Sequence, residues 1–544
     1  MTPVRLMAAA LALLLLLTAG PSTAQTPHLR DHGTTRQLIV DGAPFLMLGG
    51  ELGNSAAADL DHLSAQWTTL QTLNLNTVLA PVYWESIEPE EGRFDFTLVD
   101  GLIEQARAHD MRLVLLWFGS WKNSMSSYVP AWVKRDQARF PRARSASGEA
   151  QEILSPFSTE NMQADRRAFA ALMRRLARTD PGHTVLMVQV ENEIGMLPDA
   201  RDHSAEADAA FHAPVPRELL DHLDRNRERL DPRLDALWRA QATPMSGTWS
   251  EVFGPGDVTE EVFMAWAFGR YVEAVAAAGR AEHDLPMFVN AALNDAGVRP
   301  GAYPSAGPLP HLFDVWKAAA PSIDFLAPDI YRPNFVQRIS EFRRADNPLF
   351  IPEANRAGRP EAGADALWAV GAMDAMGFSP FAIENAAPDD PMGGTYARLA
   401  ELAPLILAHQ GQGTMTGFRA PVDAGGEVDD SPAHVTLGDF VFTVAFVDPW
   451  TPRDRQNTAA HGGLLIQLSD EEFLAVGTGV TLTFASAHDP ALRVGIESID
   501  EGRFIDGEWR AGRRLNGDEN HQGRHLRLPP GEVGIQRLQL YTYR

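Results

Sequence analysis

Two glutamates, Glu193 and Glu353, each end an apolar segment of the chain. Glu193 closes the segment that contains Val185–Val190, and Glu353 closes Leu349-Phe350-Ile351. Val- and Leu-rich runs are typical of strands buried in a parallel sheet, and the polar C-terminal ends of such strands carry the site of a (β/α)8 barrel. Two carboxyl groups across a cleft can hydrolyse a glycosidic bond, because one protonates the departing oxygen while the other attacks the anomeric carbon or activates water. Their separation decides between retention and inversion.

The polar group Glu191-Asn192-Glu193 does not by itself show which glutamate is the acid. Glu191 and Glu193 lie two residues apart, so on a regular strand both side chains point to the same side. Burying such groups without partners is costly, which leaves a strand-to-loop turn with solvated acids as the alternative interpretation of this stretch. The presence of Glu353 favours a site.

Strands and helices alternate along the first 390 residues. The pattern predicts a parallel α/β barrel, with strands four and seven opposite each other across its mouth. Helices are predicted at about 60–73, 96–109 and 165–178. The eight predicted strands are the second arm of a hairpin over 38–50 and the segments 77–84, 112–118, 184–190, 287–290, 323–331, 348–353 and 377–385.

A change of composition divides the chain. We expect a signal peptide at 1–24, a catalytic barrel at 25–413 and a smaller all-β, sandwich-like domain at 414–544, where short Val/Thr/Phe-rich runs alternate with turn residues. A helical insertion at about 196–285 is either a lid or substrate wall, or a packed appendage. The C-terminal domain could bind glycan, brace the barrel or form a dimer contact, and a homodimer stays open.

Composition and charge narrow the classes of function. The 544 residues include no cysteine, which excludes disulfides and a thiolate nucleophile, and the net charge of −24 argues against nucleic acid as a partner. Ala8–Thr18 is apolar and Ser22-Thr23-Ala24 suits a signal peptidase, so we expect a periplasmic or secreted protein without a membrane anchor after cleavage. The 16 histidines show no clustered ligand spacing, and acid/nucleophile chemistry requires no metal or cofactor.

Three motifs give the chain a resemblance to a known family. Gln189–Gly195, the stretch from Leu75 to Phe96 with Trp84 and Glu88-Pro89, and Val129-Pro130-Ala131-Trp132 occur in the order of motifs of the glycoside hydrolase family 35 β-galactosidases. The resemblance covers about residues 37–390. The β-rich tail is similar to that of a bacterial branch of this family and also to family 42 relatives of the same clan.

The resemblance implies roles for individual residues. Glu193 is the acid/base, Asn192 contacts the 2-hydroxyl group of the sugar, and Glu353 is the nucleophile of a covalent glycosyl-enzyme. Tyr331 could donate a hydrogen bond that keeps Glu353 ionised, with packing at the barrel rim as the alternative. Glu191 is then a buried partner within the barrel, and its pairing with a cation is left open.

The sequence departs from the common family pattern around the sugar pocket. Leu52-Gly53-Asn54 replaces a His-Tyr pair, Trp121-Lys122-Asn123 replaces Cys-Ala-Glu, and Ile351-Pro352 replaces Asn-Ser. For every candidate sugar contact, packing at the rim is the alternative. The candidates are Glu51, Tyr83, Trp121 and Asn123, followed by Trp84, Trp249 and Glu384.

The expected activity is that of a retaining, exo-acting β-galactosidase. Its expected substrates are terminal β-D-galactosyl residues of oligosaccharides, with plant cell-wall glycans such as xyloglucan among them. One alternative keeps the mechanism and changes the substrate, giving a β-glucosidase or an endo-acting hydrolase of the same clan. The other alternative is a carbohydrate-binding protein on an inactive barrel.

Overall fold

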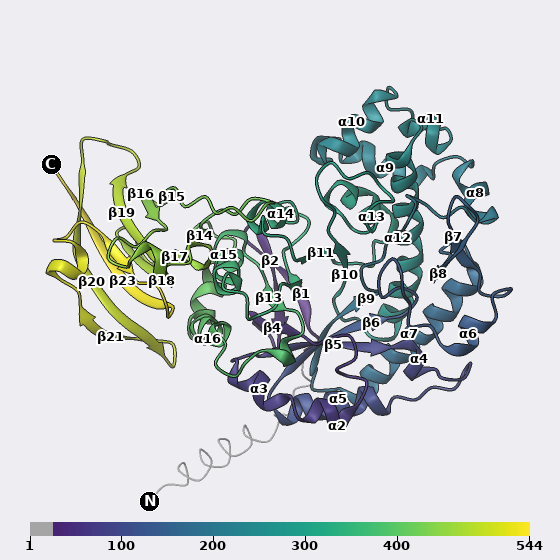
Figure 1. Cartoon of the computed structure of the whole chain (residues 1–544), viewed down its shortest axis with the longest axis horizontal. Coiled ribbons are helices and arrows are strands. Elements are labelled where there is room, and N and C mark those ends of the chain that lie inside the picture. Colours follow the sequence, from purple (N-terminus) through teal and green to yellow (C-terminus); the bar gives the residue numbers. More distant parts are fainter. Residues whose placement is uncertain (1–24) are drawn as a thin grey trace, which may run out of the picture.

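A computed structural model describes residues 25–544, so the expected signal peptide at 1–24 lies outside the described residues. The larger part is a closed barrel of eight parallel strands with helices around it (Figure 1). Every residue of most of these strands is buried, as the apolar runs predicted. In chain order the strands are β4 (Met47–Glu51), β5 (Thr77–Tyr83), β6 (Arg112–Phe118), β9 (Val185–Val190), β10 (Met287–Ala292), β11 (Phe325–Ile330), β12 (Ile351–Ala354) and β13 (Gly377–Pro380).

The predicted N-terminal hairpin is present, but its second arm divides into two strands, of which the second is the first barrel strand as predicted. The arm β2 (Thr35–Val40) pairs with the two-residue strand β3 (Ala43–Pro44), and the barrel strand β4 starts anew at Met47. The turn residues Asp41 and Gly42 have φ of 51° and 81°, which the Asp-Gly pair tolerates and which a tight hairpin turn requires. A further strand, β1 (His28–His32), pairs with β2 and was not predicted.

The helical insertion contains one helix of the barrel layer itself. The long helix α12 (Asp257–Glu282) packs along α7 (Thr159–Thr179), where Gly279 lets the helices approach so closely that a Cβ atom there would lie 2.2 Å from the Phe169 ring. The shorter helices gather beside one end of α12 in Figure 1. These are α8 (Ala205–Phe211), α9 (Arg217–Arg225), α10 (Pro232–Ala240) and α11 (Trp249–Phe253).

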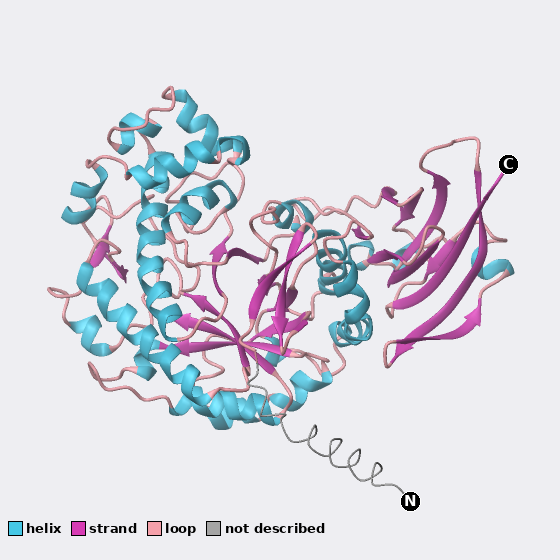
Figure 2. Ribbon diagram, turned by 180° about the vertical axis from the view of Figure 1, so that it is seen from behind, coloured by secondary structure: helices cyan, strands magenta, loops and turns pink. Residues whose placement is uncertain are grey.

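The C-terminal part is a β-sandwich, as predicted (Figure 2). Phe440 and Phe442 of one sheet pack against Phe473 of the other, with ring centroids 5.6 and 5.0 Å apart. Its six-stranded sheet has the order β14 (Met415–Arg419), β17 (Gly462–Gln467), β18 (Glu472–Thr478), β23 (Gly534–Tyr543), β20 (Arg493–Ile505) and β21 (Glu508–Arg514). The four-stranded sheet has the order β15 (Ala433–Leu437), β16 (Phe440–Ala445), β19 (Val480–Ser486) and β22 (Leu526–Leu528).

The sandwich is docked on the barrel through α15 (Ala362–Met373), which packs against β14 and β17. A Cβ atom on Gly371 would lie 2.7 Å from Cβ of Leu464, so the small residue sets this close approach. A buried ion pair between Asp365 and Arg419 crosses the same joint. Within residues 25–544, no helix combines the length and hydropathy needed to cross a membrane.

Candidate active site

The carboxyl groups of Glu193 and Glu353 meet at the C-terminal end of the barrel. Glu353 lies on β12, and Glu193 follows β9 on the opposite side, as predicted for strands seven and four. One carboxylate oxygen from each of Glu193, Glu353 and Asp329 on β11 lies within 4.8 Å of the other two. Three oxygens at this spacing could also hold a cation, but we assign none because the ammonium group of Lys122 already supplies positive charge there.

The backbone leaves the regular strand before the two glutamates of the motif. Strand β9 ends at Val190, and Glu191 and Glu193 adopt left-handed φ values of 62° and 41°. The expectation from regular strand geometry, that both side chains point to one side, therefore does not apply here. Non-glycine residues held in this region of backbone space cost on the order of 1–3 kcal/mol each and cluster at active sites.

Glu193 lies in an environment that suits a proton donor. Burial and the charge of Glu353 raise its pKa to about 7, although the nearby Lys122 ammonium opposes this shift. Its backbone N–H donates to Oδ1 of Asn290 at 2.9 Å, which fixes the loop after β9. A carboxyl group that keeps its proton near neutral pH can donate that proton to a leaving group.

Glu353 is buried and is held by a tyrosine. The hydroxyl group of Tyr331 donates a hydrogen bond to Oε1 of Glu353, which is the contact considered from the sequence. Tyr331 itself is 41% exposed, and its ring lies edge-on to Phe381 with centroids 6.3 Å apart. An ionised carboxylate is the form that attacks as a nucleophile, and its oxygens can only accept hydrogen bonds such as this one.

Lys122 is the cation of the site and was not among the predicted site residues. Its Nζ lies 3.9 Å from Oε2 of Glu193 and 5.2 Å from the centroid of the Phe118 ring. The charges of Glu193, Glu353, Glu51 and Asp329 raise its pKa, although burial acts in the opposite direction as the largest single effect. Lys122 therefore remains an ammonium ion among carboxyl groups.

A chain of amides connects the strand ends. Nδ2 of Asn290 donates to Oδ2 of Asp329 at 2.5 Å and to Oδ1 of Asn192 at 3.1 Å. The buried Asn192 also accepts from Gln189 at 2.7 Å and donates to the backbone oxygen of Lys122 at 2.9 Å. Because its side chain is engaged inside the protein, a contact between Asn192 and a sugar hydroxyl group stays a prediction.

Glu191 is buried as expected, but its partner is an acid and not a cation. Its carboxyl group lies next to that of Asp165, and its Oε2 accepts from the backbone N–H of Trp121 at 2.8 Å. Burial, followed by the charge of Asp165, raises the pKa of Glu191 well above its usual range. The hydrogen bond from Trp121 to Glu191 anchors the loop that carries Lys122.

Two of the other predicted sugar contacts, Trp121 and Tyr83, are buried. Trp121 is fully buried and lies edge-on to Phe268 and Tyr271, with centroids 5.4 and 4.8 Å away, so its ring cannot stack on a sugar. Tyr83 is buried against Phe118 and Tyr128.

The side chains of Asn123 and Glu384 form hydrogen bonds that hold loops in place. Oδ1 of Asn123 accepts from the backbone of Met125 at 2.9 Å and from Ser126 at 3.0 Å, which closes the loop after β6. The carboxylate of Glu384 accepts from the backbone N–H of Gly53 at 3.1 Å. The buried Trp84 and Trp249 pack within the protein. Glu51 differs from all of these, because it ends β4 directly beside Glu353.

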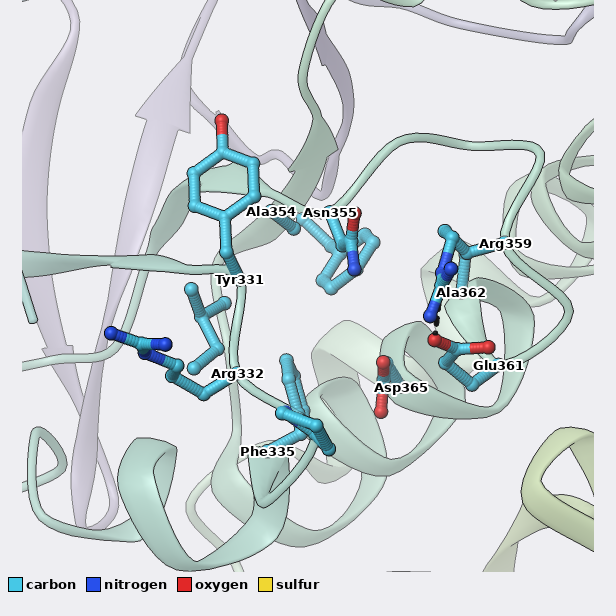
Figure 3. A pocket seen from close by; sticks show the side chains of 12 residues that line it. Tyr331, Arg332, Phe335, Ala354, Asn355, Arg359, Glu361, Ala362 and Asp365 are labelled. Atoms are coloured by element: carbon cyan, nitrogen blue, oxygen red, sulfur yellow. Dashed lines mark hydrogen bonds and ion pairs between the residues drawn. The ribbon is translucent and has the colours of Figure 1, made fainter. Parts of the chain in front are cut away.

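A small pocket lies beside Tyr331 (Figure 3). Figure 3 shows the Tyr331 side chain pointing out of this pocket, whereas Asn355 and the Asp365 carboxylate turn toward its interior. Neither Glu193 nor Glu353 lines it. This pocket is therefore separate from the paired carboxyl groups.

Two of the three site residues that were not predicted share one sequence signal. Asn290 and Asp329 are single polar residues within apolar runs, in the segments that became β10 and β11. Lys122 stands between two residues that were singled out. Asn290 and Asp329 could have been identified as lone polar residues near the C-terminal end of a predicted barrel strand. Nothing in the local sequence distinguishes Lys122 from its neighbours.

Fold and site together define a (β/α)8-barrel protein with a pair of carboxyl groups at the barrel mouth. Residues 58–267 match the model of glycoside hydrolase family 42, described as beta-galactosidase, and residues 392–527 match a domain of unknown function, DUF5597. The first match includes Glu193 and ends before Glu353. The resemblance to β-galactosidases is thus supported at the level of the clan, but family 42 fits and the assignment to family 35 is not supported.

The chain is also similar to individual proteins named beta-galactosidase. The chain is 29% identical over 211 residues to a beta-galactosidase of Xanthomonas manihotis, which is 36% of this chain and 31% of that protein. A beta-galactosidase structure from G. stearothermophilus aligns with a TM-score of 0.48 at 11% identity, over 91% of this chain and 98% of the other. One from Halorubrum lacusprofundi gives 0.46 at 19%, over 65% and 58%.

Proposed function

We propose that this protein is a retaining, exo-acting β-galactosidase. The observation that carries the proposal is the pair Glu193 and Glu353, whose carboxylate oxygens lie within 4.8 Å of each other in two different environments. Retaining glycosidases hold their two carboxyl groups about 5 Å apart, whereas inverting enzymes leave room for a water molecule between them. The spacing therefore supports double displacement.

In the first step, Glu353 attacks the anomeric carbon while Glu193 donates its proton to the departing glycosidic oxygen. The pKa of about 7 keeps Glu193 largely protonated in mildly acidic solution. The Tyr331 hydroxyl group orients the attacking carboxylate of Glu353. Bond formation to Glu353 and departure of the protonated leaving group give a covalent glycosyl-enzyme.

In the second step, Glu193 acts as a base toward water. Ester formation removes the negative charge of Glu353, which is one of the causes of the raised pKa of Glu193. Without that charge Glu193 holds its proton less tightly, so it can accept a proton from the attacking water. The same residue thus serves as acid and then as base.

The substrate class is inferred from the relatives and from the burial of the site. The family model and the Xanthomonas relative are both described as beta-galactosidase. Glu353 is 5% exposed, and the side chain of Glu193 is 18% exposed. Carboxyl groups recessed to this extent suit a chain end better than an internal linkage. We therefore propose terminal β-D-galactosyl residues as the substrate, with plant cell-wall oligosaccharides as candidates.

We also propose export of the protein to the periplasm or the medium. This proposal depends on the apolar segment Ala8–Thr18 and the small residues before Gln25. Amino-terminal sequencing of protein recovered from outside the cytoplasm tests it, and we expect Gln25 as the first residue. Recovery of the uncleaved chain from the cytoplasm alone would overturn it.

Turnover of nitrophenyl β-galactoside, with the corresponding β-glucoside beside it, tests the proposed function. We expect galactoside turnover that falls by roughly 10²–10⁴-fold in Glu193→Gln. Glu353→Gln should lose turnover altogether, because it lacks the nucleophile. Preference for the glucoside would change the proposed sugar, and full turnover by Glu353→Gln would refute the role of that residue.

A further inference from the structure

The carboxyl group of Glu51 lies against the proposed nucleophile. Glu51 is the last residue of β4 and is almost completely buried. Its side chain lies within hydrogen-bonding reach of that of Glu353, which comes from β12 on the other side of β13. Two carboxyl groups are thus in direct contact at the bottom of the site.

This contact requires a proton. Among the described residues, no donor contacts the buried Oε1 of Glu51 or the buried Oε2 of Glu353. An ionised carboxylate can only accept hydrogen bonds, so two ionised groups in contact would repel each other and leave both oxygens unsatisfied. One proton between the two groups satisfies both oxygens.

The surroundings place this proton on Glu51. Oε1 of Glu353 accepts a hydrogen bond from the Tyr331 hydroxyl group, so Glu353 already acts as an acceptor. Burial, followed by the charge of Glu353, raises the pKa of Glu51 well above its usual range. The charge of Glu193 also raises the pKa of Glu51, and the Lys122 ammonium lowers it.

We propose that Glu51 is a positioning residue that remains protonated and donates a hydrogen bond to Oε2 of Glu353. The nucleophile is then held by two donors, Tyr331 on one oxygen and Glu51 on the other, which fixes the plane of its carboxylate. The same donor stabilises the charge that returns to Glu353 when the glycosyl-enzyme is hydrolysed. This inference rests on the proposed role of Glu353.

Two variants separate the donor from the shape of the side chain. Glu51→Gln keeps a neutral donor and the size of the residue, whereas Glu51→Leu removes the donor. The substrate is dinitrophenyl β-galactoside, because its leaving group needs no proton from Glu193, and kcat/KM is measured across pH. Thermal unfolding of each variant reports whether it is folded.

We expect Glu51→Leu to lose about tenfold or more in kcat/KM at every pH. Glu51→Gln should stay within about threefold of the parent protein at neutral pH, because the amide still donates. The parent protein should lose activity at high pH, where Glu51 gives up its proton and two carboxylates face each other. Glu51→Gln should not show this decline.

Asp329→Asn is the matched control. Asp329 is another buried acid of the same cluster, but its hydrogen bond goes to Asn290 and not to Glu353. This variant should keep the decline at high pH. The inference is overturned if Glu51→Leu matches Glu51→Gln, or if Glu51→Gln declines as the parent protein does.

Infrared spectroscopy tests the protonation state of Glu51 without a measurement of turnover. The difference spectrum between the parent protein and Glu51→Gln should contain the band of a protonated carboxyl group at neutral pH, and the band should vanish at high pH. Absence of this band refutes the protonated state of Glu51. Absence of galactoside turnover by the parent protein, with the band present, refutes the proposed function instead.

Discussion

Individual charged residues determine which carboxyl groups at the barrel mouth are protonated. Glu51, Glu193, Asp329 and Glu353 bring four carboxyl groups together, and Lys122 adds one ammonium group. Burial is the first cause of the raised pKa values of Glu51 and Asp329, and it favours the protonated forms of both acids. Fewer ionised groups then remain in the cluster. A protonated Glu193 can therefore lie beside the anionic nucleophile Glu353.

Replacing Lys122 with Met tests this balance. The ammonium group lowers the pKa of Glu193 from the value that burial and Glu353 alone would give. Glu193 must be protonated in the first step, so activity on a substrate with a poor leaving group falls as pH rises through about 7. In Lys122→Met we expect this fall at higher pH, by on the order of one pH unit. The pH dependence of kcat/KM on lactose measures the shift.

Lys134→Met is the control for this variant. Nζ of Lys134 lies 2.9 Å from Oε2 of Glu85 in a partly exposed pair, and neither residue is among the charges that shift the pKa of Glu193. Pairs of this kind contribute about 0–1 kcal/mol to stability, and the alkaline fall should stay where it is in the parent protein. An unchanged profile in Lys122→Met would contradict the assigned electrostatic role.

At the level of the elements, the amino-acid sequence is sufficient to locate the strand ends. Each predicted barrel strand corresponds to a strand of the structure, because runs of buried apolar residues stop where the barrel opens to solvent. The apolar runs alone therefore place Glu193 and Glu353 at one end of the barrel. The extra strand β1 and the β7–β8 hairpin (Arg142–Arg144 and Ala150–Leu154) were missed, because neither contains an apolar run.

The loops after the strands could not be predicted in the same way. Trp121 and Lys122 are neighbours, yet the indole is buried against Phe268 and Tyr271 while the ammonium group lies among the acids. The two left-handed residues Glu191 and Glu193 likewise broke the alternation that a regular strand would impose. Directions of side chains in irregular backbone depend on contacts between distant segments, which a single sequence does not display.

Asn290→Leu tests whether β10 positions the acid loop. The variant removes the acceptor of the Glu193 N–H and the donor to Asp329. Leaving buried polar partners unsatisfied costs about 1–3 kcal/mol of stability per group. We expect a lower free energy of unfolding in urea together with a lower kcat, because the proton donor is no longer held in place.

Asn347→Leu is the matched control for this prediction. Asn347 is also a fully buried asparagine, but it bonds to the backbone of Leu326 and Phe342. We expect a similar loss of stability with kcat near that of the parent protein. Equal losses of kcat in both variants would show that the effect of Asn290→Leu is general destabilisation.

At the scale of the whole molecule, the sandwich and the barrel form a close joint. Gly371 of α15 faces both Leu464 and Gly417, and the Asp365–Arg419 ion pair lies buried beside them. A joint this tight predicts that the two parts stabilise each other. The composition change near residue 413 indicated two units, but nothing in the sequence showed that α15 would pack against the sandwich.

Alanine substitutions at two helical glycines test this joint. Gly371→Ala places a Cβ atom 2.7 Å from Cβ of Leu464, so we expect a net destabilisation of about 1–3 kcal/mol. Gly394 lies exposed in α16 (Pro391–His409) with no neighbouring atom within 4 Å of an added Cβ. Gly394→Ala should therefore stabilise the protein by about 0.5–1 kcal/mol. Chemical denaturation measures both, and equal stabilisation would contradict the close joint.

The whole mechanism depends on the identity of the nucleophile, and trapping of the glycosyl-enzyme identifies that residue. The protein is incubated with a 2-deoxy-2-fluoro-β-galactosyl fluoride, which slows the second step, and its peptides are analysed by mass spectrometry. We predict one fluorogalactosyl group on the peptide that contains Glu353, and none in Glu353→Gln. A label on another residue, or turnover that releases the inverted anomer without any label, would contradict the role assigned to Glu353.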